Sequence, residues 1–168
     1  YAMVAIIMPQ AASLERTQAV TERADAILAK IPGVQTRSLI SGYSLVDGGF
    51  KTNAATIFIT FKDFKERYAD IETAKAQNAR AILTAFYDQA KHIQEAVVIP
   101  IAPPAIPGIG TTGGFEFWIQ DTAAGSPVEL GNQVQAFLVK ARQRPELAGV
   151  NTTFNANSQQ LRADVDRE

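Results

Sequence analysis

Apolar side chains at the start of the chain follow first the period of a strand and then that of a helix. Residues 1–8 form an apolar run, which predicts a strand covered on both faces, one of them by a helix. Residues 14–31 carry an apolar stripe at helical spacing, with Ser13 as N-cap, Glu15 in the first turn and Pro32-Gly33 at the end. We therefore expect an amphipathic helix docked on a sheet.

The same two patterns recur up to residue 101. Residues 34–40, 55–61 and 96–101 predict three further strands, and Asp70 can cap a second helix whose stripe runs to Ile93. The resulting order is strand, helix, strand, strand, helix, strand. This is the ferredoxin-like split βαβ arrangement, so the predicted fold class is α+β.

A long connection, residues 41–53, joins the second and third predicted strands, although two residues would suffice for a hairpin. Backbone freedom comes from Gly42, Gly48 and Gly49. The large apolar side chains of this loop are Tyr43, Leu45, Val46 and Phe50. An Ω-loop packed on its own side chains and a loop that contacts a ligand explain this composition equally well.

A second unit repeats the first pattern after a segment rich in proline and glycine, residues 102–114. We place the boundary so that the units are 1–105 and 106–168. Residues 115–120, 150–154 and 160–165 predict strands, and Ser126 with Glu129 forms a capping box around Pro127. The second unit is thus an incomplete βαββ copy, and we expect the natural protein to continue beyond residue 168.

Composition limits the chemistry that is available. The 168 residues carry a net charge of -1, with no basic cluster, so nucleic acid is not an expected partner. There is no cysteine, and His92 is the single histidine, so neither a zinc site nor a nucleophilic triad can be assembled. No apolar run reaches the roughly 20 residues of a membrane span. We expect no enzymatic activity, no metal and no cofactor.

Aromatic positions give the best sign of a binding site. Phe115 and Phe117 share one predicted strand face with Ile119, and Phe58 stands between two threonines. Such side chains are usually core. Two half-sheets that meet at a cleft beside a glycine-hinged loop would equally present an apolar pocket to small molecules.

Four segments in register carry a resemblance to a known family: residues 9–18 (PQAASLERTQ), 41–45 (SGYSL), 61–67 (FKDFKER) and 114–117 (GFEF). Together they resemble the C-terminal periplasmic half of resistance-nodulation-division (RND) transporters, the hydrophobe/amphiphile efflux pumps. The resemblance covers essentially the whole chain. It implies a complete first porter subdomain followed by the first part of a second one.

The resemblance also implies roles for individual residues. The long loop would be a switch loop between two drug pockets, with Tyr43 and Leu45 at its tip. Ile40 and Phe58 would line the deep pocket. The entrance pocket, between the subdomains, would be lined by Met3, Ala5, Ile7, Phe115, Phe117 and Ile119. Family members commonly carry phenylalanine where this chain has Ser38, Tyr43 and Leu45, so its pocket is expected to be less aromatic.

The family further implies partners and a location. The chain would be the periplasmic portion of a proton-coupled antiporter in a Gram-negative inner membrane, working as a homotrimer with a periplasmic adaptor protein and an outer-membrane channel. Its ligands would be hydrophobic or amphiphilic small molecules. The alternative is a stand-alone ferredoxin-like module that binds small molecules or regulates a partner.

Overall fold

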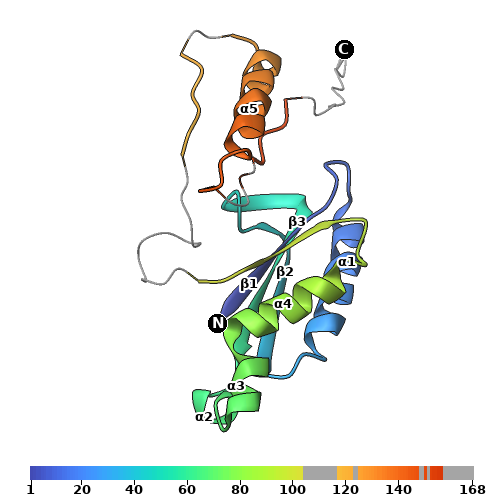
Figure 1. Ribbon diagram of the computed structural model, residues 1–168. Coiled ribbons are helices and arrows are strands. Elements are labelled where there is room, and N and C mark those ends of the chain that lie inside the picture. The colour runs from blue at the N-terminus through green and yellow to red at the C-terminus, as the bar shows by residue number, and fades with distance from the viewer. Residues whose placement is uncertain (104–116, 123–124, 148–149, 151, 157–168) are drawn as a thin grey trace, which may run out of the picture. The chain divides into compact units, whose positions relative to one another are not determined.

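The chain forms two compact units, Tyr1–Phe115 and Glu116–Glu168. The computed structural model describes residues 1–103, 117–122, 125–147, 150 and 152–156 (Figure 1). The first unit contains, in chain order, β1 (Ala2–Ile7), α1 (Leu14–Leu28), β2 (Val34–Ser44), β3 (Gly49–Phe61), α2 (Phe64–Arg67), α3 (Ile71–Gln77), α4 (Ala79–Ala90) and β4 (Val97–Ile101).

The four strands form one antiparallel sheet in the order β2-β3-β1-β4. This order confirms the predicted ferredoxin-like arrangement and the α+β class. The helices α1 and α4 lie on one face of the sheet (Figure 1). Between them and the strands is the main core, whose fully buried members include Val4, Ile6, Val20, Leu28, Ile57, Ile59, Ile82 and Phe86.

Capping residues set the helix boundaries. The Ser13 side chain accepts a hydrogen bond from the backbone N–H of Arg16, as its N-cap role predicts. The predicted second helix is split in two, because Asn78 adopts extended backbone angles and caps α4 by accepting from the N–H of Ala81. Asp70 caps α3 through the N–H of Thr73. This hydrogen bond lowers the pKa of Asp70.

The prediction of a long loop at residues 41–53 is wrong. β2 continues to Ser44 and β3 begins at Gly49, so only residues 45–48 form the turn. Cross-strand pairs Tyr43↔Phe50 and Ser44↔Gly49 satisfy backbone groups that a loop would leave to water. Neither an Ω-loop nor an extended loop fits this segment, which is the outer part of a hairpin.

The second unit contains one long helix among its described residues, α5 (Pro127–Ala141). Its capping box between Ser126 and Glu129 is present as predicted, with Pro127 at the start of the helix. The described parts of two predicted strands, 117–120 and 152–154, are not strands in the structure. A strand is defined by hydrogen bonds to a paired neighbour, and these residues form no such ladder. Residues 115–116, 151 and 160–165 of the predicted strands lie outside the described part of the chain.

The packing of Gly33 gives a direct test of the first unit. Gly33 has φ of +90°, and a Cβ there would lie 2.8 Å from Cδ1 of Ile82. We expect Gly33→Ala to lower the free energy of unfolding by about 2 to 4 kcal/mol, through backbone strain and overpacking. Gly49→Ala is the control, because nothing lies within 4 Å of a Cβ at that site. Equal losses in urea denaturation for both variants would contradict this packing.

Candidate functional site

The second face of the sheet, opposite the helices, collects five of the ten residues predicted to contact substrate. Strand register pairs Met3 with Phe58 and Ala5 with Thr56, and Thr56 in turn pairs with Ile40. Directly paired residues share a face, and alternate residues of one strand do too. Met3, Ala5, Ile7, Ile40 and Phe58 therefore lie on one side of the sheet.

The second face is uncharged, and it is apolar along β1 and β4, whereas its β2–β3 part also carries Thr36, Ser38, Thr56 and Thr60. β4 extends it with Val97, Ile99 and Ile101, which pair with Ile7, Ala5 and Met3 respectively. Met3 and Ala5 are buried, Phe58 and Ile7 are half-buried, and Ile40 and Val97 are 41% and 59% exposed. A surface of this kind can bind an apolar group by excluding water, and it offers no acid, base or nucleophile.

The outer part of the hairpin carries the other predicted residues of the first unit. Tyr43 is half-buried, and its ring meets that of Phe50 edge-on with centroids 5.7 Å apart. Leu45 lies in the turn and is half-buried. Gly42 and Gly48 have φ of +88° and +65°, which only glycine adopts freely, whereas Gly49 does not.

The predicted site residues of the second unit are placed only in part. Phe117 and Ile119 are 49% and 40% exposed, and the Phe117 ring lies edge-on to that of Phe137 on α5, with centroids 5.2 Å apart. Phe115 lies outside the described residues. The entrance pocket between the two units stays a prediction.

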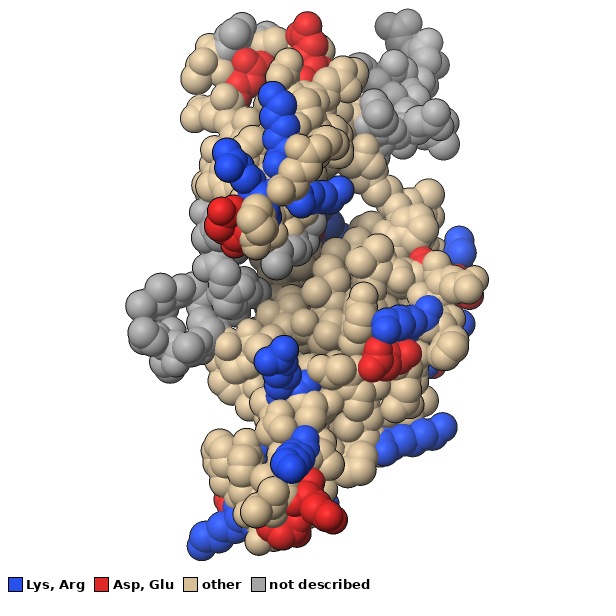
Figure 2. Space-filling view, in the orientation of Figure 1, with Lys and Arg blue, Asp and Glu red and all other residues tan. Residues whose placement is uncertain are grey.

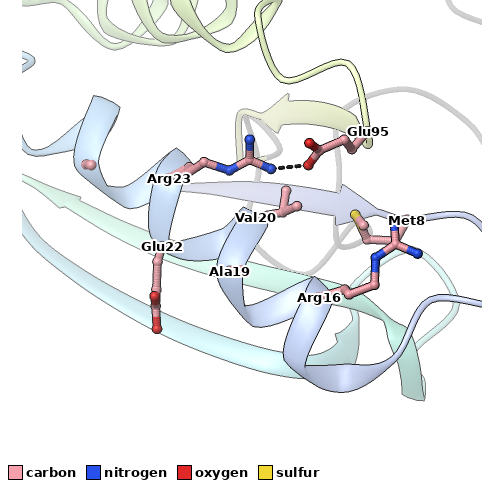
Figure 3. Close-up of a pocket in the computed structure, with 8 residues that line it drawn as sticks. Met8, Arg16, Ala19, Val20, Glu22, Arg23 and Glu95 are labelled. Carbon is pink, nitrogen blue, oxygen red and sulfur yellow. Dashed lines mark hydrogen bonds and ion pairs between the residues drawn. The ribbon is translucent and has the colours of Figure 1, made fainter.

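Two surface grooves, each of about 530 Å³, lie elsewhere on the first unit and include none of the predicted site residues. One runs along α1, where an ion pair joins Arg23 to Glu95 across it (Figure 3). Both side chains are about half exposed, so the pair contributes little stability. The other groove lies between α4 and β4 and is lined by Leu83, Tyr87 and Pro100, among others. Sequence patterns alone gave no sign of either groove.

A buried arginine accounts for the structural role of the FKDFKER segment, one of the four segments that carry the resemblance. Arg67 is only 4% exposed and donates to the carbonyl oxygens of Lys62 and Gln77 at 2.8 and 3.0 Å. Its guanidinium also lies 4.8 to 5.5 Å from the ring centres of Phe61, Phe64 and Tyr68. The FKDFKER segment thus joins β3 to α2 and α3, which is a structural role.

Charge is distributed without a dominant sign on the visible face of the described residues. Figure 2 shows Lys and Arg side chains interspersed with Asp and Glu. Shifted pKa values occur at helix ends: the backbone N–H of Glu15 lowers the pKa of its own carboxyl, and Asp88 raises the pKa of Lys91. Within the described ranges, no cluster of acidic, His or Cys side chains could hold a metal ion. No described helix is long and apolar enough to cross a membrane.

Comparison with known proteins assigns the family. The sequence model of the AcrB/AcrD/AcrF family matches residues 1–168. The chain belongs to this family. It is 29% identical to the solvent-resistant pump membrane transporter SrpB of Pseudomonas putida over 99% of its length, and 30% identical to the multidrug export protein AcrF of Escherichia coli over 97%. The resemblance to RND multidrug and solvent efflux transporters is thereby confirmed.

A third relative is the toluene efflux pump membrane transporter TtgE of Pseudomonas putida, 26% identical over 99% of the chain. In each of these three relatives the match covers 15% of the protein. This AcrB/AcrD/AcrF-family chain therefore spans about one seventh of the length of the transporters that it resembles.

Two neighbouring residues of β3 test the assignment of the sheet faces. Ile57 is fully buried against the helices, whereas Phe58 is half-buried on the second face. We expect Ile57→Ala to cost about 2 to 5 kcal/mol of unfolding free energy, and Phe58→Ala roughly half as much or less, because part of its ring already contacts water. Chemical denaturation of both variants measures this. A larger loss for Phe58→Ala would identify Phe58 as core.

Proposed function

We propose that this chain is part of the periplasmic porter region of a proton-coupled RND efflux pump in a Gram-negative inner membrane, where it captures hydrophobic or amphiphilic compounds for export. The observation that carries the proposal is the apolar second face of the sheet. Five residues that the resemblance assigns to substrate contact lie there together, from three different strands. Family membership supports the same conclusion.

Binding at this face would be driven by burial of apolar surface. Each Å² removed from water contributes about 25 cal/mol, so a ligand is selected by its apolar area and shape and not by charge. The half-buried Phe58 ring offers a flat contact surface to such a ligand. The proposal includes no chemical step, because export leaves the compound unchanged.

The outer hairpin would control passage of substrate past this face. Gly42 and Gly48 allow the backbone to change direction, and Tyr43 and Leu45 are the side chains that would move. In the complete pump, a homotrimer with a periplasmic adaptor and an outer-membrane channel would carry the compound onward. The names of the relatives, a multidrug export protein and toluene and solvent pumps, support export of apolar compounds.

A dye titration tests where apolar ligands bind. A hydrophobic naphthylamine dye should bind the purified chain, and Phe58→Ala should weaken the affinity about five- to thirtyfold, the equivalent of about 1 to 2 kcal/mol. The matched control is Tyr87→Ala, which removes a half-exposed aromatic ring from the α4 groove on the other face. Wild-type affinity for Phe58→Ala, or a comparable loss for Tyr87→Ala, would contradict the proposed site.

Efflux by the full-length transporter tests the role of the hairpin turn. Nothing lies within 4 Å of a Cβ at Gly48 or Gly49, but only Gly48 has positive φ. We expect Gly48→Val to reduce efflux of large substrates more than of small ones at unchanged protein level, whereas Gly49→Val should have little effect. A uniform loss for all substrates together with reduced protein would indicate a purely structural turn. A stand-alone binding module would show no efflux phenotype for either variant.

A further inference from the structure

The β2–β3 hairpin consists of two ladders that are joined by an irregular segment. Between the pairs Ser41↔Ala55 and Tyr43↔Phe50, β2 advances two residues while β3 advances five. Surplus residues on one strand bend a ladder and interrupt its pairing. The outer ladder with its turn, residues 43–50, is called the hairpin tip below. It is connected to the main sheet through Gly42 on one strand and residues 51–54 on the other.

The β3 side of this joint is fixed to the rest of the unit. The Thr17 hydroxyl on α1 donates to the carbonyl oxygen of Thr52 at 2.7 Å. Asn53 donates from its side-chain amide to the carbonyl oxygen of Met8 at 2.9 Å, and its own carbonyl accepts from the N–H of Met8 at 2.8 Å. Residues 52 and 53 are therefore held on α1 and on the end of β1.

The β2 side of the joint has a different attachment. Gly42 has φ of +88°, so the chain turns there in a way that a side chain would oppose. One residue further, the carbonyl oxygen of Tyr43 accepts a hydrogen bond from the Thr56 hydroxyl at 2.9 Å. Thr56 is fully buried, and it belongs to the part of β3 that pairs with both β1 and β2. This bond ties the first residue of the tip to the centre of the sheet.

We propose that Thr56 is a positioning residue for the hairpin tip. Its hydroxyl holds the Tyr43 carbonyl and so fixes the orientation in which the tip presents the Tyr43 ring, and loss of this bond lets the tip pivot at Gly42. The inference rests on the proposed function in one respect, which is that Tyr43 contacts an apolar substrate. A buried hydrogen bond of this kind changes a conformational equilibrium by about fivefold.

A simpler interpretation is that the hydroxyl only satisfies its own hydrogen-bonding need, as buried polar groups generally do. The two interpretations differ in what moves when the hydroxyl is removed. If it holds the tip, the tip alone leaves its orientation. If the hydroxyl only satisfies its own hydrogen bond, its removal lowers the stability of the whole sheet, and no second orientation of the tip is populated.

Distances between paired spin labels in the 168-residue chain can separate the two interpretations. These 168 residues include no cysteine, so two introduced cysteines are the only labelling sites. Val46→Cys in the turn with Glu22→Cys on α1 reports tip to helix, and Gln35→Cys with Glu22→Cys reports sheet to helix. All three positions are exposed. Pulsed electron spin resonance then gives both distance distributions.

Thr56→Val should enlarge a second tip-to-helix distance population about fivefold and leave the sheet-to-helix distribution unchanged. Thr56→Ala, which also lacks the hydroxyl, should do the same, whereas Thr56→Ser should match the wild type. Thr21→Val is the matched control: Thr21 is equally buried, but its hydroxyl donates to the carbonyl of Thr17 inside α1. This control should leave the tip in place.

The proposal is overturned if Thr56→Val superimposes on the wild type, if Thr56→Ser behaves like Thr56→Val, or if both label pairs shift together. The measurement uses no substrate, so its outcome is independent of whether the chain binds apolar compounds. Failure of the naphthylamine dye to bind would count against the proposed function alone. An unmoved tip would count against the role of Thr56 alone.

Discussion

Both faces of β1 are apolar, and this constraint organises the first unit. The strand lies between β3 and β4, so its backbone groups are paired on either side. Val4 and Ile6 face the helices and are completely buried, which anchors α1 and α4 to the sheet. Met3, Ala5 and Ile7 point the opposite way and lie opposite residues of β3 and β4 that are also apolar or uncharged. One strand thereby supports a core and, behind it, the candidate binding face.

Periodic patterns predicted the parts of the fold that depend on local sequence. The continuous apolar run in residues 1–8 predicted β1, helical spacing predicted α1, and the caps at Ser13 and Ser126 lie where their side chains can accept backbone N–H groups. The order of the strands in the sheet was also predictable from the order of the elements, since few topologies connect them. The face shared by Met3, Ala5 and Ile7 was predictable from the strand period of two.

Features that depend on tertiary contacts were not predictable in this way. The three glycines of residues 41–53 predicted a loop, yet cross-strand pairing and the anchors at Thr52 and Asn53 place all of this segment except the turn at residues 45–48 in strands. The pattern on both sides of Asn78 predicted one continuous helix, but Asn78 divides it into two. The residues around Thr56 are typical of a strand and give no sign of its contact. Only the bend of the hairpin brings the Tyr43 carbonyl within reach of the Thr56 hydroxyl.

We propose that apolar ligands bind the second face of the sheet. Isoleucine methyl signals in NMR spectra test it directly, because the same residue type occupies both faces. On addition of an apolar dye, the methyl signals of Ile7, Ile40 and Ile99 should shift, while those of Ile6, Ile57 and Ile82 in the helix-facing core should stay in place. Shifts confined to the core methyls, or equal shifts on both faces, would contradict the account.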